Sequence, residues 1–145
     1  MSAGIHGYGT VLKVHEGTNT TYTTIGNITS ISGPDQSRDS IDISTMDSTN
    51  KFREFLPGMI DAGELTAELN YDSSSGGVAS SLDTLSRSTA TNLNWVIEFN
   101  DGTTPSSFEC AGHITRLGYA IPFHDKVTQS VTIKLSGEPT YTDLT

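Results

Sequence analysis

Residues 63–71 read Gly63-Glu64-Leu65-Thr66-Ala67-Glu68-Leu69-Asn70-Tyr71. Apolar and polar residues alternate along the whole stretch. Successive side chains of a β-strand point to opposite faces, so Leu65 and Leu69 lie on one face while Glu64 and Glu68 lie on the other. A period of two residues predicts a half-buried strand with one apolar and one polar face.

Further segments with strand character lie on both sides of residues 63–71. Short apolar runs rich in threonine alternate with glycine, serine and asparagine, which is the pattern of a chain of many short strands. The predicted strands are 10–15, 21–25, 28–32, 39–44, 94–100, 108–119 and 127–136. In the long strand 108–119, Gly112 and Gly118 are candidate points for a bulge or a bend. The sequence therefore predicts a mainly β fold, a β-sandwich of two packed antiparallel sheets.

One segment has the period of a helix. Val78, Leu82 and Leu85 recur at the spacing of one helical face. The spacing predicts a short helix from about 76 to 87 that flanks the sandwich. Residues 140–145, beyond the last predicted strand, are expected to form a loose tail.

Length and charge limit the class of protein. The 145 residues suit a single domain, 1–145, and the start of the chain has neither a signal peptide nor a transmembrane run. The net charge of −9 comes from 17 acidic and 8 basic residues. Such a surface repels phosphate backbones, which argues against sequence-specific nucleic-acid binding but suits a surface past which DNA slides.

The segment between the predicted strands 39–44 and 63–71 is unusual. Residues 45–62 contain no clear strand pattern, and structureless loops of this length are uncommon in compact domains. The loop is also rich in large apolar side chains, which must be buried somewhere. Two alternatives are open: the loop covers its own sandwich as a lid or an extra strand, or it docks on another subunit. The candidate interface residues are Met46, Phe52, Arg53, Phe55, Leu56, Pro57, Met59 and Ile60.

Three blocks of the sequence resemble a known family. They are Asp39 to Ser48, Arg53 to Met59, and Asp61 to Tyr71, of which the block Asp61-Ala62-Gly63-Glu64 is the most specific. Together with residues 9–14 and 127–139 they resemble the major tail tube proteins of bacteriophages with long non-contractile tails. The chain ends at Thr145 and so resembles members without an added immunoglobulin-like domain.

This resemblance implies a structural virion protein that self-assembles into stacked hexameric rings. The rings would form the tail tube through which DNA passes without sequence-specific binding, and the loop 45–62 would pack on a neighbouring copy. Polar and acidic side chains line the tube in this family, which makes Glu64 and Glu68 candidates for the lumen. The resemblance also implies the tape measure, tail terminator and tip proteins as partners, assembly in the host cytoplasm, and no contact with a membrane.

No group of residues predicts catalysis, a metal site or a cofactor. The four histidines have no metal-binding spacing, and the odd spacing of Cys110 and His113 places them on opposite faces of a strand. We therefore expect no enzyme. The alternative function is a monomeric β-sandwich module that binds a receptor or carbohydrate at a tail tip or in an adhesin. It would need an exposed aromatic patch, whereas Trp95 lies in an alternating strand and is expected in the core.

Overall fold

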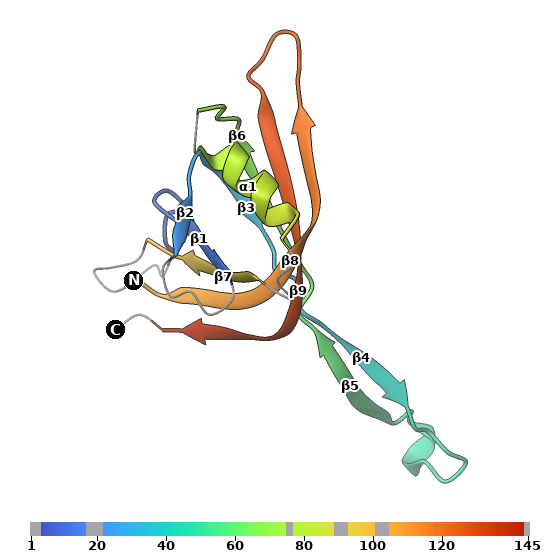
Figure 1. Ribbon diagram of the computed structural model, residues 1–145. Coiled ribbons are helices and arrows are strands. Elements are labelled where there is room, and N and C mark those ends of the chain that lie inside the picture. The colour runs from blue at the N-terminus through green and yellow to red at the C-terminus, as the bar shows by residue number, and fades with distance from the viewer. Residues whose placement is uncertain (1–3, 17–21, 75–76, 89–92, 101–104, 144–145) are drawn as a thin grey trace.

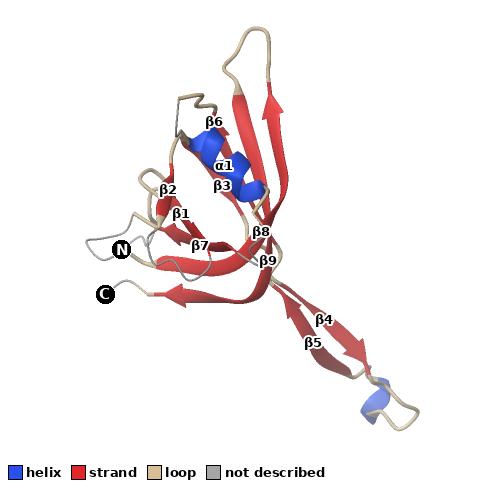
Figure 2. Cartoon of the chain, in the orientation of Figure 1, coloured by secondary structure: helices blue, strands red, loops and turns tan. Residues whose placement is uncertain are grey.

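Strands make up most of the described chain (Figure 2). The computed structural model describes residues 4–16, 22–74, 77–88, 93–100 and 105–143. Its strands are β1 (Val11–Glu16), β2 (Thr23–Ile25), β3 (Ile28–Ser32), β4 (Ser37–Asp42), β5 (Phe55–Asp61), β6 (Glu64–Asn70), β7 (Leu93–Glu98), β8 (Ser107–Ala120) and β9 (Thr128–Thr142). The helix α1 spans Val78–Ser86, and a short 3-10 turn spans Thr49–Lys51.

The strands form two antiparallel sheets. One has seven strands in the order β2-β1-β7-β8-β9-β6-β3, and the other has the two strands β4 and β5. The predicted mainly β fold with two antiparallel sheets and one short α-helix is confirmed. The helix lies within the predicted span of 76–87, although residue 76 itself is outside the described residues.

The two layers of the core come from a bend in the larger sheet. Residues 107–112 of β8 pair with β7, whereas residues 113–120 pair with β9 alone among the described strands. The long strands β8 and β9 curve between these halves, so that the sheet turns back over itself (Figure 1). Shifts in the register of β8 and β9 lie near the bend, as expected of bulges. Gly112, one of the predicted bend points, lies close to β9. A Cβ at this position would lie 2.6 Å from the carbonyl oxygen of Lys134, so the close approach of the two strands requires glycine.

The apolar core fills the space inside this bend. Leu12 and Trp95 from one half of the sheet belong to the same cluster as Leu65 and Leu69 from the other, and all four side chains are fully buried. The helix α1 closes the core, because Leu82 is fully buried in that cluster and α1 packs on β8. The polar face of β6 therefore points away from both core and helix.

The prediction of a loop over residues 45–62 is wrong for residues 55–61. Residues 55–61 form the strand β5, and the connection between the strands of the smaller sheet covers only 43–54. Pro57 and Gly58 interrupt the regular alternation of a strand in this segment. In the structure they lie beside a register shift between Arg38 and Ser40. Proline is tolerated at such bulges and in edge strands, and both strands of a two-stranded sheet are edges.

The last strand is longer than predicted. The loose tail 140–145 is wrong up to Thr142, because β9 continues through Thr142 and pairs there with Ser107 of β8. The predicted strand 127–136 stopped before Gly137 and Pro139, residue types that commonly end a strand. Gly137 adopts a φ of +80°, which only glycine tolerates easily, and β8 supplies partners on its far side. Residues 144–145 are outside the described chain.

Candidate interaction surfaces

The smaller sheet forms an arm, residues 37–61, that extends away from the rest of the molecule (Figure 1). Within the described chain, β4 and β5 pack on each other and make no comparable contact with another element. An isolated two-stranded hairpin is at best marginally stable in water. The part of the chain that the structure describes thus supplies no packing partner that would stabilise the arm.

The surface of the arm is strongly apolar. Met46 is fully exposed, Met59 is 89% exposed and Phe52 is 74% exposed. Contiguous exposed apolar patches of this kind mark interaction sites. The predicted interface residues all lie on the arm and are all exposed: Met46, Phe52, Arg53, Phe55, Leu56, Pro57, Met59 and Ile60. Among the described residues no other element packs over these side chains, which argues against a lid. Part of the segment does form an extra strand, β5, but it pairs with β4 in the arm and not with the larger sheet.

The exposure of two further apolar residues of the arm was not predicted from the sequence. Ile41 and Ile43 were assigned to a half-buried strand, yet they are 49% and 46% exposed. The alternating pattern was read correctly as a strand. It carried no information on whether the apolar face had anything to pack against.

Hydrogen bonds give the outer end of the arm a defined shape. The amide of Ile43 donates to the carbonyl oxygen of Glu54 at 2.9 Å, and the amide of Glu54 donates to Oγ of Ser44 at 2.7 Å. The amide of Ser44 donates to Oδ1 of Asp42 at 2.9 Å. The hydrogen bonds from Ser44 hold the pKa of the Asp42 carboxyl below its usual value. The arm thus presents its apolar side chains on an ordered support.

A second exposed apolar patch lies at the other end of the molecule. Between β8 and β9 the chain forms a hairpin tip, residues 121–127, where Phe123 is 93% exposed and Ile121 is 76% exposed. Figure 1 shows the tip and the arm at opposite ends. The register agrees, since β6 leaves the arm at Glu64 and ends beside Thr128, next to the tip. Sequence reasoning missed this patch because two separated apolar residues in a connection carry no periodic signal.

The larger sheet also has free strand edges. The strand β3 pairs only with β6, and residues 113–120 of β8 pair only with β9, within the described chain. Unpaired edges expose rows of amide and carbonyl groups that can bind another strand. On the polar face between these edges, Glu64 and Glu68, the candidates for a lumen, are both exposed.

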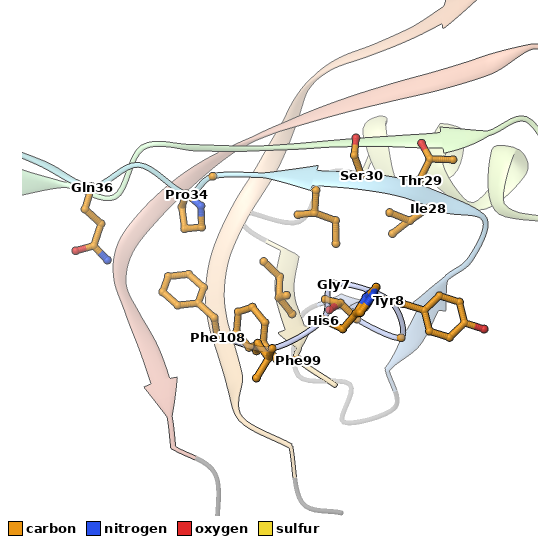
Figure 3. Close-up of a pocket in the computed structure, with 16 residues that line it drawn as sticks. His6, Gly7, Tyr8, Ile28, Thr29, Ser30, Pro34, Gln36, Phe99 and Phe108 are labelled. Atoms are coloured by element: carbon orange, nitrogen blue, oxygen red, sulfur yellow. The ribbon is translucent and has the colours of Figure 1, made fainter. Parts of the chain in front are cut away.

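A groove opens beside the base of the arm (Figure 3). Its volume is about 1060 Å³, and Phe99, Phe108 and residues of β3 form much of its wall. Its polar side chains are those of His6, Tyr8, Thr10, Thr29, Ser30 and Gln36. The lining is therefore mixed, with an apolar wall and polar groups beside it.

The described residues do not form a reactive centre. Among them, no three His, Cys, Asp or Glu side chains are grouped so that they could hold a metal ion. Cys110 is buried, and burial raises the pKa of its thiol to about 11, whereas His113 is exposed. No described helix is long and apolar enough to span a bilayer.

Comparison with known proteins gives one family and a set of similar folds. The family model described as phage tail tube, lambda-like, matches residues 5–119. No curated protein matches the sequence.

The solved structures that are similar share little sequence with the chain. An anti-feeding prophage baseplate chain has 12% identity and a TM-score of 0.74, with 98% of this chain and 97% of that chain covered. A chain from the tail of a gene transfer agent particle has 14% identity and a TM-score of 0.69, with 97% and 100% covered. The SPP1 tail tube chain has 10% identity and a TM-score of 0.66, with 95% and 78% covered. At these identities the likeness shows the fold alone.

Proposed function

Because this chain belongs to the lambda-like phage tail tube family, we propose that its copies assemble into hexameric rings that stack into the tail tube of a virion. The observation that carries the proposal is the arm, whose exposed apolar side chains have no packing partner among the described residues. Two of the similar assemblies, the anti-feeding prophage baseplate and the gene transfer agent tail, have sixfold symmetry. The role is structural and not catalytic.

Strand pairing between copies would close the ring. The part of the sheet with a polar outer face has the order β8-β9-β6-β3, and its strands alternate in direction. Since their number is even, the free edge of β8 in one copy is antiparallel to β3 of the next. The pattern therefore repeats around a ring without a parallel junction.

Contacts at the two ends of the molecule would stack the rings. The arm and the hairpin tip lie at opposite ends of the strands, and both expose apolar side chains. Surfaces that differ at the two ends give a head-to-tail contact, which does not close on itself. Such a contact adds rings without limit, as a tube requires, and the burial of the arm would stabilise it.

The polar face of the sheet would line the lumen of the tube. Glu64 and Glu68 lie on that face, away from the core and from α1. With a net charge of −9, the chain offers DNA little attraction. DNA would pass without sequence-specific binding.

Other tail proteins would meet the ends of the tube. The similar structures include a sheath and tube terminator and a tube-terminating cap. By analogy, we expect a tail terminator, a tip protein and a tape measure protein as partners here. The protein would reside in the virion tail after assembly in the host cytoplasm.

The alternative of a monomeric carbohydrate- or receptor-binding module has less support. Trp95, the single tryptophan, is fully buried, and its Nε1 donates to the carbonyl oxygen of Gly112 at 3.2 Å. It cannot serve as an exposed stacking platform. Glycan-array binding by a protein that stays monomeric would favour that alternative.

Electron microscopy of the concentrated protein tests the proposal. We expect rings and tubes from the natural sequence. The double variant Phe52→Ala with Phe55→Ala should lose the tubes and remain folded, because both side chains are exposed in the monomer. Tyr141→Ala, which removes another exposed aromatic ring outside the arm, near the end of β9, is the control. A natural protein that never multimerises, or a double variant that unfolds, would contradict the proposal.

A further inference from the structure

The polar face of the larger sheet carries opposite charges near its two free edges. Glu64 and Glu68 lie on β6, one strand from the free edge at β3. Arg116 lies on the free part of β8, in register with Thr132 on β9 and so on the same polar face. All three side chains are exposed. The sheet is thus acidic near one edge and basic at the other.

These charges have no partner within the described chain. The ion pairs there join Lys13 to Glu98, Arg53 to Asp42, Arg87 to Asp83 and Lys134 to Asp61. Lys134 stands opposite Glu64 in the register, yet its ammonium group binds Asp61. No hydrogen bond or ion pair involves the side chain of Arg116, Glu64 or Glu68 in the described residues.

Edge-to-edge pairing of two copies would bring these charges together. Neighbouring strands lie about 4.8 Å apart, so β6 of the next copy would lie about 10 Å from β8. Extended arginine and glutamate side chains together span such a gap. Only β3 stands between them, and its polar face carries the small side chains of Ser30 and Ser32. Nothing bulky would separate the two charges.

We propose that Arg116 of one copy forms an ion pair with a β6 carboxylate, Glu64 or Glu68, of the next copy across the strand junction. The inference rests on the ring closure proposed above. The partner is a second copy of this chain, because the complementary charge lies on the opposite edge of the same sheet. The diagonal offset of the two strands in the ring decides which glutamate is used.

The same charges would also select the direction of assembly. Pairing of β8 with β8 would bring two Arg116 side chains together, and pairing of β3 with β3 would leave the carboxylates of both copies without an arginine. Like charges in such positions oppose the wrong contact. Only the head-to-tail junction matches opposite signs, and that junction allows a ring.

Charge reversal in single variants and in mixtures tests the pair. Arg116→Glu should reduce ring formation at least tenfold, measured by size-exclusion chromatography and electron microscopy, because it places like charges at every junction. Glu64→Arg or Glu68→Arg should do the same at the position that forms the pair. Arg87→Glu on α1 makes the same change in charge away from the polar face and should leave assembly unchanged.

The mixture of two variants is the decisive test. An equimolar mixture of Arg116→Glu with the matching glutamate variant should form rings of alternating subunits, because each junction then joins opposite charges. Rescue by one glutamate variant would identify the partner of Arg116. If Arg116→Glu does not fold, Arg116→Gln replaces it in the test. This variant should reduce ring formation less than Arg116→Glu, and its assembly should depend less on salt concentration than that of the natural protein.

Two results would contradict the proposed ion pair and leave the proposed function intact. One is normal assembly of Arg116→Glu while the natural protein forms rings. The other is failure of both mixtures to form rings. If the natural protein itself forms no rings, the proposed function fails, and this inference fails with it.

Discussion

Nζ of Lys134 on β9 lies 2.9 Å from Oδ1 of Asp61, the last residue of the arm. The contact joins the base of the arm to the centre of the larger sheet. Asp61 also accepts a hydrogen bond from the amide of Gly63 at 2.9 Å, where the chain enters β6. The arm is therefore attached at a defined point, although none of the described elements packs on its apolar surface.

The ionisation of Asp61 reports on this attachment. The hydrogen bond from Lys134, followed by that from Gly63 and the charge of Lys134, holds the pKa of Asp61 below its ordinary value of 3.8. A depressed pKa favours the folded protein above the ordinary value, and this contribution disappears as the pH falls through the folded value. We predict that Lys134→Met moves the pKa of Asp61 back towards 3.8, measured by carboxyl NMR. The pKa of Asp42, lowered by Ser44, should not change. A pKa of Asp61 at or above 3.8 in the natural protein would contradict this.

Gly63 is required where the arm joins β6. It adopts a φ of +84°, and a Cβ there would collide with the carbonyl oxygen of Asp35. We predict that Gly63→Ala lowers the free energy of unfolding by about 3 kcal/mol, from backbone strain and the collision together. Gly137 has a similar φ of +80° with no atom within 4 Å of the added Cβ. Gly137→Ala should therefore lose only about 1 kcal/mol. If urea denaturation gave the same loss in the free energy of unfolding for Gly63→Ala and Gly137→Ala, the collision at Gly63 would add no cost and the prediction would be wrong.

Gln129 is a buried polar residue whose side chain has no hydrogen-bond partner among the described residues. Its side chain is fully buried, and neither atom of its amide makes a hydrogen bond. An unpaired buried polar group costs about 1–3 kcal/mol. We predict that Gln129→Met, which keeps the shape, raises the free energy of unfolding by about 1–2 kcal/mol. The exposed Gln36→Met should change it by less than about 0.5 kcal/mol. A loss of stability in Gln129→Met would mean that the amide is hydrogen-bonded in solution.

Cys110 should be inert while the protein is folded. Burial, with a smaller effect of the charge of Glu109, raises the pKa of its thiol from 9.0 to about 11. The thiolate is the reactive form, so a thiol reagent at pH 8 should label the folded protein slowly and the unfolded protein at once. Since folding disfavours the thiolate, this group lowers stability as the pH rises from 9.0 to about 11. Rapid labelling under native conditions would contradict the prediction.

The strand pattern of the core was predictable because burial leaves a periodic trace in the residues. Leu65, Ala67 and Leu69 alternate with polar residues, and all three are fully buried in β6. The helix was predictable for the same reason. Val78, Leu82 and Leu85 recur at helical spacing, and Leu82 lies fully buried against the larger sheet.

The family and the docking segment were also visible in the residues. The predicted interface positions around Phe52 and Phe55 all lie on one exposed arm, and the family is confirmed. Large apolar side chains without a place in the periodic pattern indicated a surface to be buried elsewhere. That they dock on a second copy is still a prediction.

Local sequence therefore determined which side chains are apolar, how they alternate and, through this, the class and family of the protein. Tertiary structure alone decided where each face points. Ile41 alternates like a core residue but projects into solvent at 49% exposure, whereas β9 continues past Gly137 because β8 lies beside it. Alternation is a property of neighbours in the chain. Burial and strand pairing depend on which distant segment lies opposite, and for the arm and the free edges that segment belongs to no part of the described chain.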